Sequence, residues 1–177
     1  YNTWSSYAPE EEGVVIAYSS IYGNTARAAR RLLELISKKM PAVLYDLARC
    51  DMALAVADAF RYSKLVLATT TYNADIFPFM RTFITALTER AYQNRTVAFI
   101  ENGSWAPLAT KVMKGMLEES KNLTYAETSV RINSAMSAAN KEELEALAAE
   151  LEELTVELNI KGGEGGKTFG SVSSKEI

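Results

Sequence analysis

The sequence predicts an α/β fold, with a doubly wound parallel sheet of five strands and helices on both faces. Short apolar runs alternate with stretches of helical spacing along most of the chain, an order typical of parallel sheets with right-handed crossovers. The run at 65–68 is apolar throughout, as in a central parallel strand buried on both faces. Polar, hydroxyl-rich segments follow three of the apolar runs, at the edge where such sheets hold their ligands.

The first half of the chain supplies three strands and two helices. We expect strands at about 14–19, 42–45 and 65–68, and helices at about 24–39 and 51–59. In the first helix, Ala28, Leu32 and Ile36 recur at helical spacing, with arginines on the outer face. Pro41 ends this helix because proline cannot continue the backbone hydrogen bonds.

The second half supplies the remaining elements. We expect strands at 96–100 and 124–132, and helices at 77–90, 107–119 and 141–158. Pro78 is tolerated in the first turn of its helix. In the last helix, a leucine stripe at three- and four-residue steps predicts a core face, and the glutamates between indicate a solvated surface. The stripe is Leu144, Leu147, Leu151, Leu154 and Leu158.

Composition excludes several classes of protein. With 177 residues, 48% of them hydrophobic, the chain suits one domain with a sizeable core. It has no histidine and one cysteine, Cys50, which removes Ser-His-Asp triads, histidine-bound metals and internal disulfides. The net charge of −3 includes no basic cluster, so we expect no nucleic-acid partner. No apolar run is long enough to span a membrane, and we expect a cytoplasmic domain with no membrane partner.

The hexapeptide Ser20-Ile21-Tyr22-Gly23-Asn24-Thr25 lies between the first predicted strand and the first predicted helix. Two hydroxyls, a glycine that allows close backbone approach and a helix start offer hydrogen-bond donors to a phosphate dianion. The loop holds no lysine or arginine, so amides, hydroxyls and the helix dipole would balance the charge. This favours a ligand held in place over a nucleotide that is hydrolysed, because P-loop hydrolases add a lysine and a magnesium ligand.

Three polar loops, at 19–25, 69–75 and 101–107, follow predicted strands. The carboxyl ends of parallel strands meet at one edge of a sheet, so we expect these loops to share a ligand. The candidate residues of the second and third loops are Thr70, Thr71, Tyr72, Asn73, Asn102, Gly103, Ser104 and Trp105.

Together the loops resemble those of flavodoxin-like FMN domains, most of all the C-terminal flavodoxin domain of flavodiiron proteins (A-type flavoproteins). The hexapeptide stands where that family carries Ser-Met-Tyr-Gly-Asn-Thr, and the segment 70–73 stands where it carries Pro-Thr-Tyr-Asn. The segment 102–105 occupies the place of a Tyr-Gly-Trp-Ser type loop. The chain departs from the family at Thr70, which replaces a proline, and in the order of Ser104 and Trp105.

The resemblance implies the strand order 2-1-3-4-5, bound FMN and cofactor-binding residues in all three loops, with no catalytic or metal-ligating residue. It makes Tyr72 and Trp105 candidates to stack on the flavin ring. Asp75 and Glu101 are candidates to set the charge around the ring, although simple solvation is the plainer interpretation of both carboxylates.

The resemblance also implies a domain organisation. Residues 1–12 are interpreted as a connector from a diiron domain, 13–160 as the FMN-binding domain and 161–177 as a flexible polar tail or linker. Because the chain begins at Tyr1 without methionine, we expect a neighbouring domain upstream. The implied partners are a diiron domain, a rubredoxin-like donor and, in the full-length protein, a second copy in a homodimer.

The leading hypothesis is therefore an FMN electron-transfer domain, the flavin half of a flavodiiron-type oxygen or nitric oxide reductase. A free-standing flavodoxin shuttle and an NAD(P)H-dependent FMN or quinone reductase remain alternatives. A response-regulator-like switch would need a phosphoacceptor aspartate at the strand edge, where the first strand ends in Ser19-Ser20.

Overall fold

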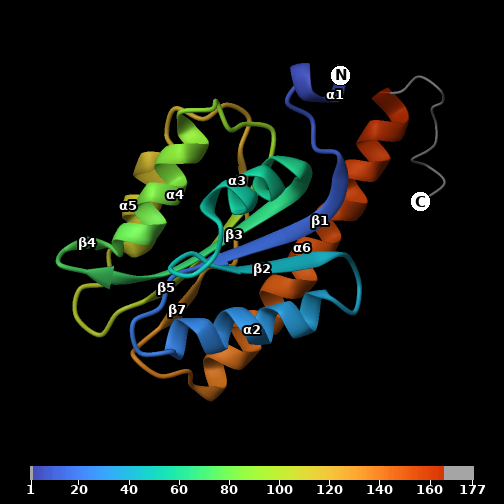
Figure 1. Ribbon diagram of the computed structural model, residues 1–177. Coiled ribbons are helices and arrows are strands. Elements are labelled where there is room, and N and C mark those ends of the chain that lie inside the picture. Colours follow the sequence, from blue (N-terminus) through green and yellow to red (C-terminus); the bar gives the residue numbers. More distant parts are fainter. Residues whose placement is uncertain (1, 166–177) are drawn as a thin grey trace.

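A parallel sheet forms the centre of the molecule (Figure 1). The computed structural model describes residues 2–165. A short strand, β4 (Asp75–Ile76), pairs antiparallel with the end of β3. The parallel strands of the sheet are β1 (Glu11–Tyr18), β2 (Ala42–Asp46), β3 (Tyr62–Tyr72), β5 (Thr96–Asn102), β6 (Thr124–Tyr125) and β7 (Val130–Ile132). They pair in parallel in the order β2-β1-β3-β5-β6, and β7 pairs with β5 beyond β6. The predicted order 2-1-3-4-5 is confirmed, with the fifth position shared by two short strands.

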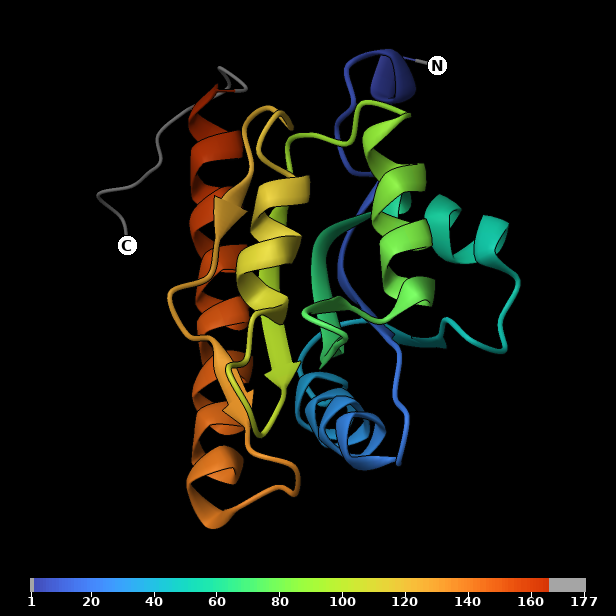
Figure 2. The ribbon, with the colours of Figure 1, turned by 90° about the vertical axis from the view of Figure 1, so that its left-hand side faces the viewer.

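Helices cover both faces of the sheet, as predicted (Figures 1 and 2). On one face lie α3 (Met52–Arg61), α4 (Pro78–Thr88) and α5 (Ala109–Met116), and on the other α2 (Asn24–Ile36) and α6 (Ala138–Gly165). The middle of β3 shows why its sequence is apolar throughout. Leu65 and Leu67 belong to the first core and Val66 to the second, and all three side chains are fully buried.

The fifth strand differs from the prediction of one strand over 124–132. The ladder is interrupted between β6 and β7, where Glu150 of α6 accepts hydrogen bonds from the amides of Glu127 (2.5 Å) and Thr128 (2.9 Å). These amides find a side-chain acceptor in place of a ladder partner, which releases the segment from the sheet. The placement of Glu150 on a purely solvated helix surface was therefore wrong.

The segment before the sheet contains structure that the sequence did not predict. A short helix, α1 (Asn2–Ser5), precedes β1, which begins at Glu11, three residues earlier than expected. Arg95 is only 4% exposed and donates to the main-chain oxygens of Tyr7 (2.6 Å), Tyr62 (3.1 Å) and Phe60. This buried guanidinium ties the N-terminal segment to the sheet, because carbonyl oxygens replace the water that it has lost.

The last helix, α6, is longer than predicted. It begins after a reciprocal pair of bonds, in which the Ser137 amide donates to Asn140 Oδ1 and the Asn140 amide donates to Ser137 Oγ. Leu144, Leu147 and Leu151 are fully buried, so these three leucines form a core face as predicted. Leu154 is half-buried, and the side chain of Leu158 lies outside the described residues. The helix continues to Gly165, which places 161–165 in a helix and not in the predicted tail. Residues 166–177 of that tail lie outside the described residues.

Candidate functional site

The hexapeptide at 20–25 forms the turn from β1 into α2. Gly23 has a φ of 90°, which a residue with a Cβ adopts only under strain, and it occupies the N-cap position of α2. Ser20 Oγ accepts a hydrogen bond from the Gly23 amide at 3.0 Å and so holds the turn closed. Among the described residues no side chain caps α2, so the amides of its first turn are open to an anion.

A cavity of about 220 Å³ lies where the carboxyl ends of β1, β3 and β5 meet. Its lining residues are Ser20, Ile21, Tyr22, Asn24, Thr25, Thr70, Thr71, Asn102, Gly103, Ser104 and Ser134. All of them except Ser134 are residues that the sequence predicted. Thr70 and Asn102 are also partners in the β3–β5 ladder, because both strands run further than expected. The sheet itself therefore fixes the distance between the second and third loops.

The predicted residues that do not line this cavity are Gly23, Tyr72, Asn73 and Trp105. Tyr72 and Asn73 line a neighbouring cavity. The side chains of Tyr72 and Trp105 are 47% and 88% exposed, so both can offer a ring face to a planar ligand. Tyr72 is held by an edge-to-face contact with Phe77, with 5.3 Å between the ring centroids.

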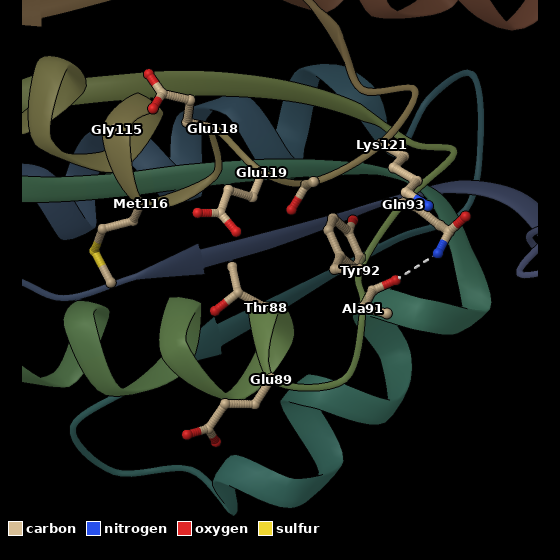
Figure 3. A pocket seen from close by; sticks show the side chains of 11 residues that line it. Thr88, Glu89, Ala91, Tyr92, Gln93, Gly115, Met116, Glu118, Glu119 and Lys121 are labelled. Carbon is tan, nitrogen blue, oxygen red and sulfur yellow. Dashed lines mark hydrogen bonds between the residues drawn. The ribbon is translucent and has the colours of Figure 1, made fainter.

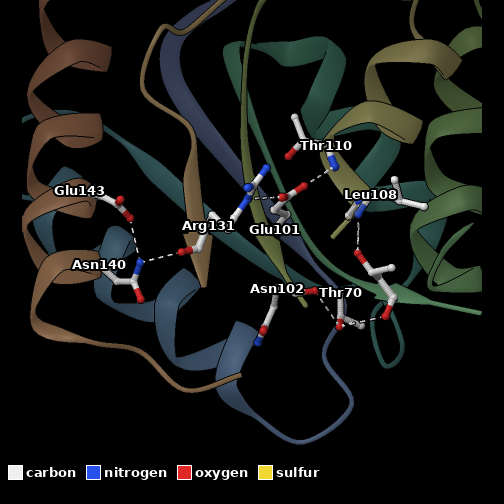
Figure 4. Close-up of polar contacts among 10 residues, drawn as sticks. Thr70, Glu101, Asn102, Leu108, Thr110, Arg131, Asn140 and Glu143 are labelled. Carbon is white, nitrogen blue, oxygen red and sulfur yellow. Dashed lines mark hydrogen bonds and ion pairs between the residues drawn. The ribbon is translucent and has the colours of Figure 1, made fainter. Parts of the chain in front are cut away.

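A hydrogen-bond network joins the strand ends at the cavity (Figure 4). Thr70 Oγ1 donates to the main-chain oxygen of Asn102 at 3.1 Å. The Asn102 side chain in turn bonds Thr25 and both backbone polar groups of Ser134. Ser134, which has a φ of 70°, is not among the residues that the sequence predicted. The available signal was its place directly after the fifth strand, at the same edge as the other polar loops.

Thr71, near the end of β3, caps α5 from a different element. No side chain within the start of α5 itself provides a cap, and Thr71 Oγ1 accepts from the amides of Leu108 (3.0 Å) and Ala109 (3.3 Å). The hydroxyl thus satisfies two amides that the helix leaves without a partner. This bond fixes the third loop against the end of β3.

The two carboxylates predicted to set the charge around a ring are both paired with arginine. Glu101 is 2% exposed and accepts from the Thr110 amide (2.8 Å) and from Arg131 Nε (2.7 Å), so its interpretation as a solvated residue was wrong. Asp75 accepts from Arg81 Nη2 at 2.5 Å, and this bond holds the pKa of Asp75 below its ordinary value. Neither residue therefore presents an unbalanced negative charge.

A positive charge lies beside the hexapeptide, although the loop itself contains none. Arg27, one turn into α2, donates from Nη2 to Asn24 Oδ1. Arg27 was predicted on the outer face of the helix, without a connection to the loop. The signal was its three-residue spacing from Asn24, which brings two helical side chains together. The guanidinium adds to the helix dipole in attracting an anion.

A larger cavity, of about 530 Å³, lies at the far ends of α4 and α5 (Figure 3). Its lining includes the carboxylates of Glu89, Glu118 and Glu119 together with Lys121. Such a lining repels a phosphate, so the cavity at 20–25 is the better anion site.

Within residues 2–165, no three residues of the types His, Cys, Asp and Glu gather as a metal site, and no helix has the length and apolar character needed to cross a membrane.

A doubly wound parallel sheet with hydroxyl-rich loops gathered at its carboxyl edge defines the flavodoxin-like class of α/β domains. The chain belongs to the flavodoxin domain family, whose sequence profile matches residues 15–131.

Solved structures share this fold. The rubredoxin oxygen:oxidoreductase of Desulfovibrio gigas has a TM-score of 0.79 at 19% identity, over 88% of this chain and 39% of that one. A flavo di-iron protein of Thermotoga maritima has a TM-score of 0.72 at 21% identity, over 87% of this chain and 39% of that one. A flavodoxin of Streptococcus pneumonia has a TM-score of 0.70 at 16% identity, over 80% of this chain and 99% of that one.

The C-terminal segment has a different relative. Residues 142–177 match the C-terminal domain of ribosomal protein L9. The large ribosomal subunit protein bL9 of Lysinibacillus sphaericus is 51% identical over 47 residues, which are 27% of this chain, so the chain spans about a third (32%) of that relative's length. The match begins inside α6, whose leucines also pack on the flavodoxin-like sheet. The flavodoxin profile match ends at residue 131, before α6 begins.

Proposed function

We propose that this chain is an FMN-binding electron-transfer domain. The observation that carries the proposal is the turn at 20–25, where an uncapped helix start, the Gly23 backbone and the hydroxyls of Ser20 and Thr25 meet at the carboxyl edge of the sheet. These donors, with Arg27 nearby, fit a phosphate dianion without a P-loop lysine or a metal ligand. FMN would supply the electron-transfer chemistry of its flavin ring.

The other predicted residues at this edge of the sheet have separate roles in this proposal. The hydroxyls of Thr70, Thr71 and Ser104 offer hydrogen bonds to a polar chain that leads from the phosphate towards the ring. Tyr72 and Trp105 cover the ring and exclude water from it. Replacing either aromatic by alanine should shift the flavin reduction potentials, measured by spectroscopic titration. Unchanged potentials in both variants would leave them no role at the ring.

The test of the proposal begins with the cofactor. We expect the purified protein, or the protein after addition of FMN, to show a flavin absorbance spectrum, and heat denaturation to release FMN in a ratio of one per chain. Chromatography of the released flavin separates FMN from FAD and riboflavin. The proposal fails if only FAD is found, or if no flavin binds after reconstitution.

We further propose that the domain is the flavin half of a flavodiiron-type oxygen or nitric oxide reductase. The two similar structures from Desulfovibrio gigas and Thermotoga maritima support this. Each alignment covers most of this chain but only 39% of the other, longer chain. Its partners would be a diiron domain and a rubredoxin-like donor, in a cytoplasmic homodimer. Residues 1–12 would be the connector and 13–160 the flavin domain, which α6 extends to residue 165, with 166–177 as a tail or linker.

The alternatives are separated by the reoxidation of the reduced flavin. After anaerobic reduction of the flavin, added nitric oxide should reoxidise the chain in catalytic turnover only when a diiron domain is present. Turnover by the isolated chain contradicts this role. Rapid bleaching of the flavin by NADPH would instead identify a reductase. Electron transfer to partner proteins that is unaffected by a diiron domain would identify a free flavodoxin. This alternative is supported by the Streptococcus flavodoxin, because the alignment covers 99% of that chain.

A second function is favoured by the match of residues 142–177 to ribosomal protein L9. We propose that this segment attaches the domain to the large ribosomal subunit, against the expectation of no nucleic-acid partner. Sedimentation through a sucrose cushion tests it: the chain should pellet with large subunits, and a chain ending at Gly165 should not. Failure of the full chain to pellet would remove this function, equal pelleting of the two chains would assign the attachment to residues 142–165, and neither result bears on flavin binding.

A further inference from the structure

Asn102 lies at the end of β5, between the hexapeptide and the segment after β7. Its side chain is largely buried, with the residue 7% exposed. Nδ2 donates to the Ser134 main-chain oxygen (3.1 Å) and to Thr25 Oγ1 (3.4 Å), and Oδ1 accepts from the Ser134 amide (3.0 Å). Both protons of the amide are therefore committed to the protein, and the amide has no donor left for a ligand.

The orientation of this amide is fixed by its partners. The Ser134 N–H can only donate and the Ser134 carbonyl can only accept, so oxygen must face the first and nitrogen the second. With the carboxamide turned this way, the second proton of Nδ2 points at Thr25 Oγ1. A flipped amide would lose both bonds to Ser134 at once.

The direction of this hydrogen bond, from Asn102 to Thr25, decides whether the Thr25 hydroxyl can donate to another group. The Thr25 hydroxyl is 2% exposed and accepts from Asn102, so its own proton is free for another acceptor, and Thr25 lines the cavity at the uncapped start of α2. We propose that Asn102 is a positioning residue that orients the Thr25 hydroxyl as a donor to the phosphate of the bound flavin nucleotide. The assignment rests on the proposed FMN function, and it makes Ser134 the anchor of the arrangement.

A variant that reverses the direction of the hydrogen bond between Asn102 and Thr25 tests the assignment. In Asn102→Asp, the carboxylate accepts from the Thr25 hydroxyl and takes its proton away from the phosphate. We expect FMN affinity to fall about tenfold or more, because a hydrogen bond to a charged group is lost. Riboflavin has no phosphate, and its affinity should change by less than about threefold. A purely structural role for Asn102 would lower both affinities equally.

Two controls separate orientation from charge. Asn133→Asp adds the same charge in the segment after β7, next to Ser134, at an exposed residue whose main-chain oxygen accepts from Ala135, and should change FMN affinity by less than about threefold. In a Thr25→Val background, Asn102→Asp should lose most of its effect on FMN, because the two changes remove one interaction. A tenfold loss that persists without the Thr25 hydroxyl would mean plain repulsion and would overturn the assignment.

The remaining outcomes are also decisive. Circular dichroism checks that each variant folds. If Asn102→Asp does not fold, Asn102→Ala replaces it, and its FMN affinity should fall by about threefold or more while its riboflavin affinity does not. Equal loss of FMN and riboflavin affinity, or unchanged FMN affinity, contradicts the positioning role. A wild-type protein that binds neither flavin overturns the proposed function itself, which is a distinct result.

Discussion

The cap that Thr71 provides to α5 should be measurable in the free energy of unfolding. Thr71→Val keeps the shape of the side chain but removes the oxygen that accepts from the amides of Leu108 and Ala109. Loss of a helix cap costs about 0.5–2 kcal/mol, and a buried amide without a partner costs about 1–3 kcal/mol. Because Thr71 is only partly buried, water can reach part of the site, and we expect a loss of about 2 kcal/mol.

Urea unfolding followed by circular dichroism measures this loss. With a denaturant slope of about 2 kcal/mol per molar, the midpoint should fall by about 1 M while the slope stays constant. Thr82→Val is the matched control, because the Thr82 hydroxyl is exposed and bonds only within its own helix turn, to the Pro78 oxygen. It should change stability by less than about 0.5 kcal/mol. Equal midpoints for the two variants would refute the capping argument.

Three further predictions concern packing and the single thiol. Leu147→Ala removes a fully buried side chain of α6 and should cost about 3 kcal/mol or more in urea unfolding, whereas a loss under about 1 kcal/mol would mean that α6 is not part of the core. Gly13→Ala places a Cβ 2.6 Å from Tyr62 Cδ1 and should lower stability by about 1–3 kcal/mol; a neutral effect in thermal unfolding would show that the ring yields freely. Burial raises the pKa of the Cys50 thiol, so its alkylation at pH 7 should be slower than in urea-unfolded chain. Equal alkylation rates in the folded and unfolded chain would contradict the raised pKa. The stability that this pKa shift contributes is complete below the ordinary thiol pKa and is lost as the pH rises through the raised value.

The alternation of strands and helices and the place of the candidate site follow from local patterns in the sequence, whereas the strand order was implied by the family resemblance. The apolar run in β3 and the leucine stripe of α6 each reveal a buried face through their period, which depends on neighbouring residues alone. In the hexapeptide, the glycine directly before the predicted helix start indicates a turn, and Gly23 has the positive φ that such a turn needs. Alternation of strands and helices then places the polar loops at one edge, because parallel strands must all return to the same side.

What the sequence by itself determined was therefore the fold, the edge that holds the site and most residues that line the cavity. Only the tertiary structure decided how their polar groups are used. Thr71 caps a helix that begins 38 residues later, Glu150 interrupts a strand from another element, and Asn102 bonds Thr25 and Ser134 across the sheet edge. No period or propensity encodes these bonds, because a buried amide or hydroxyl takes whichever acceptor the folded chain brings within reach.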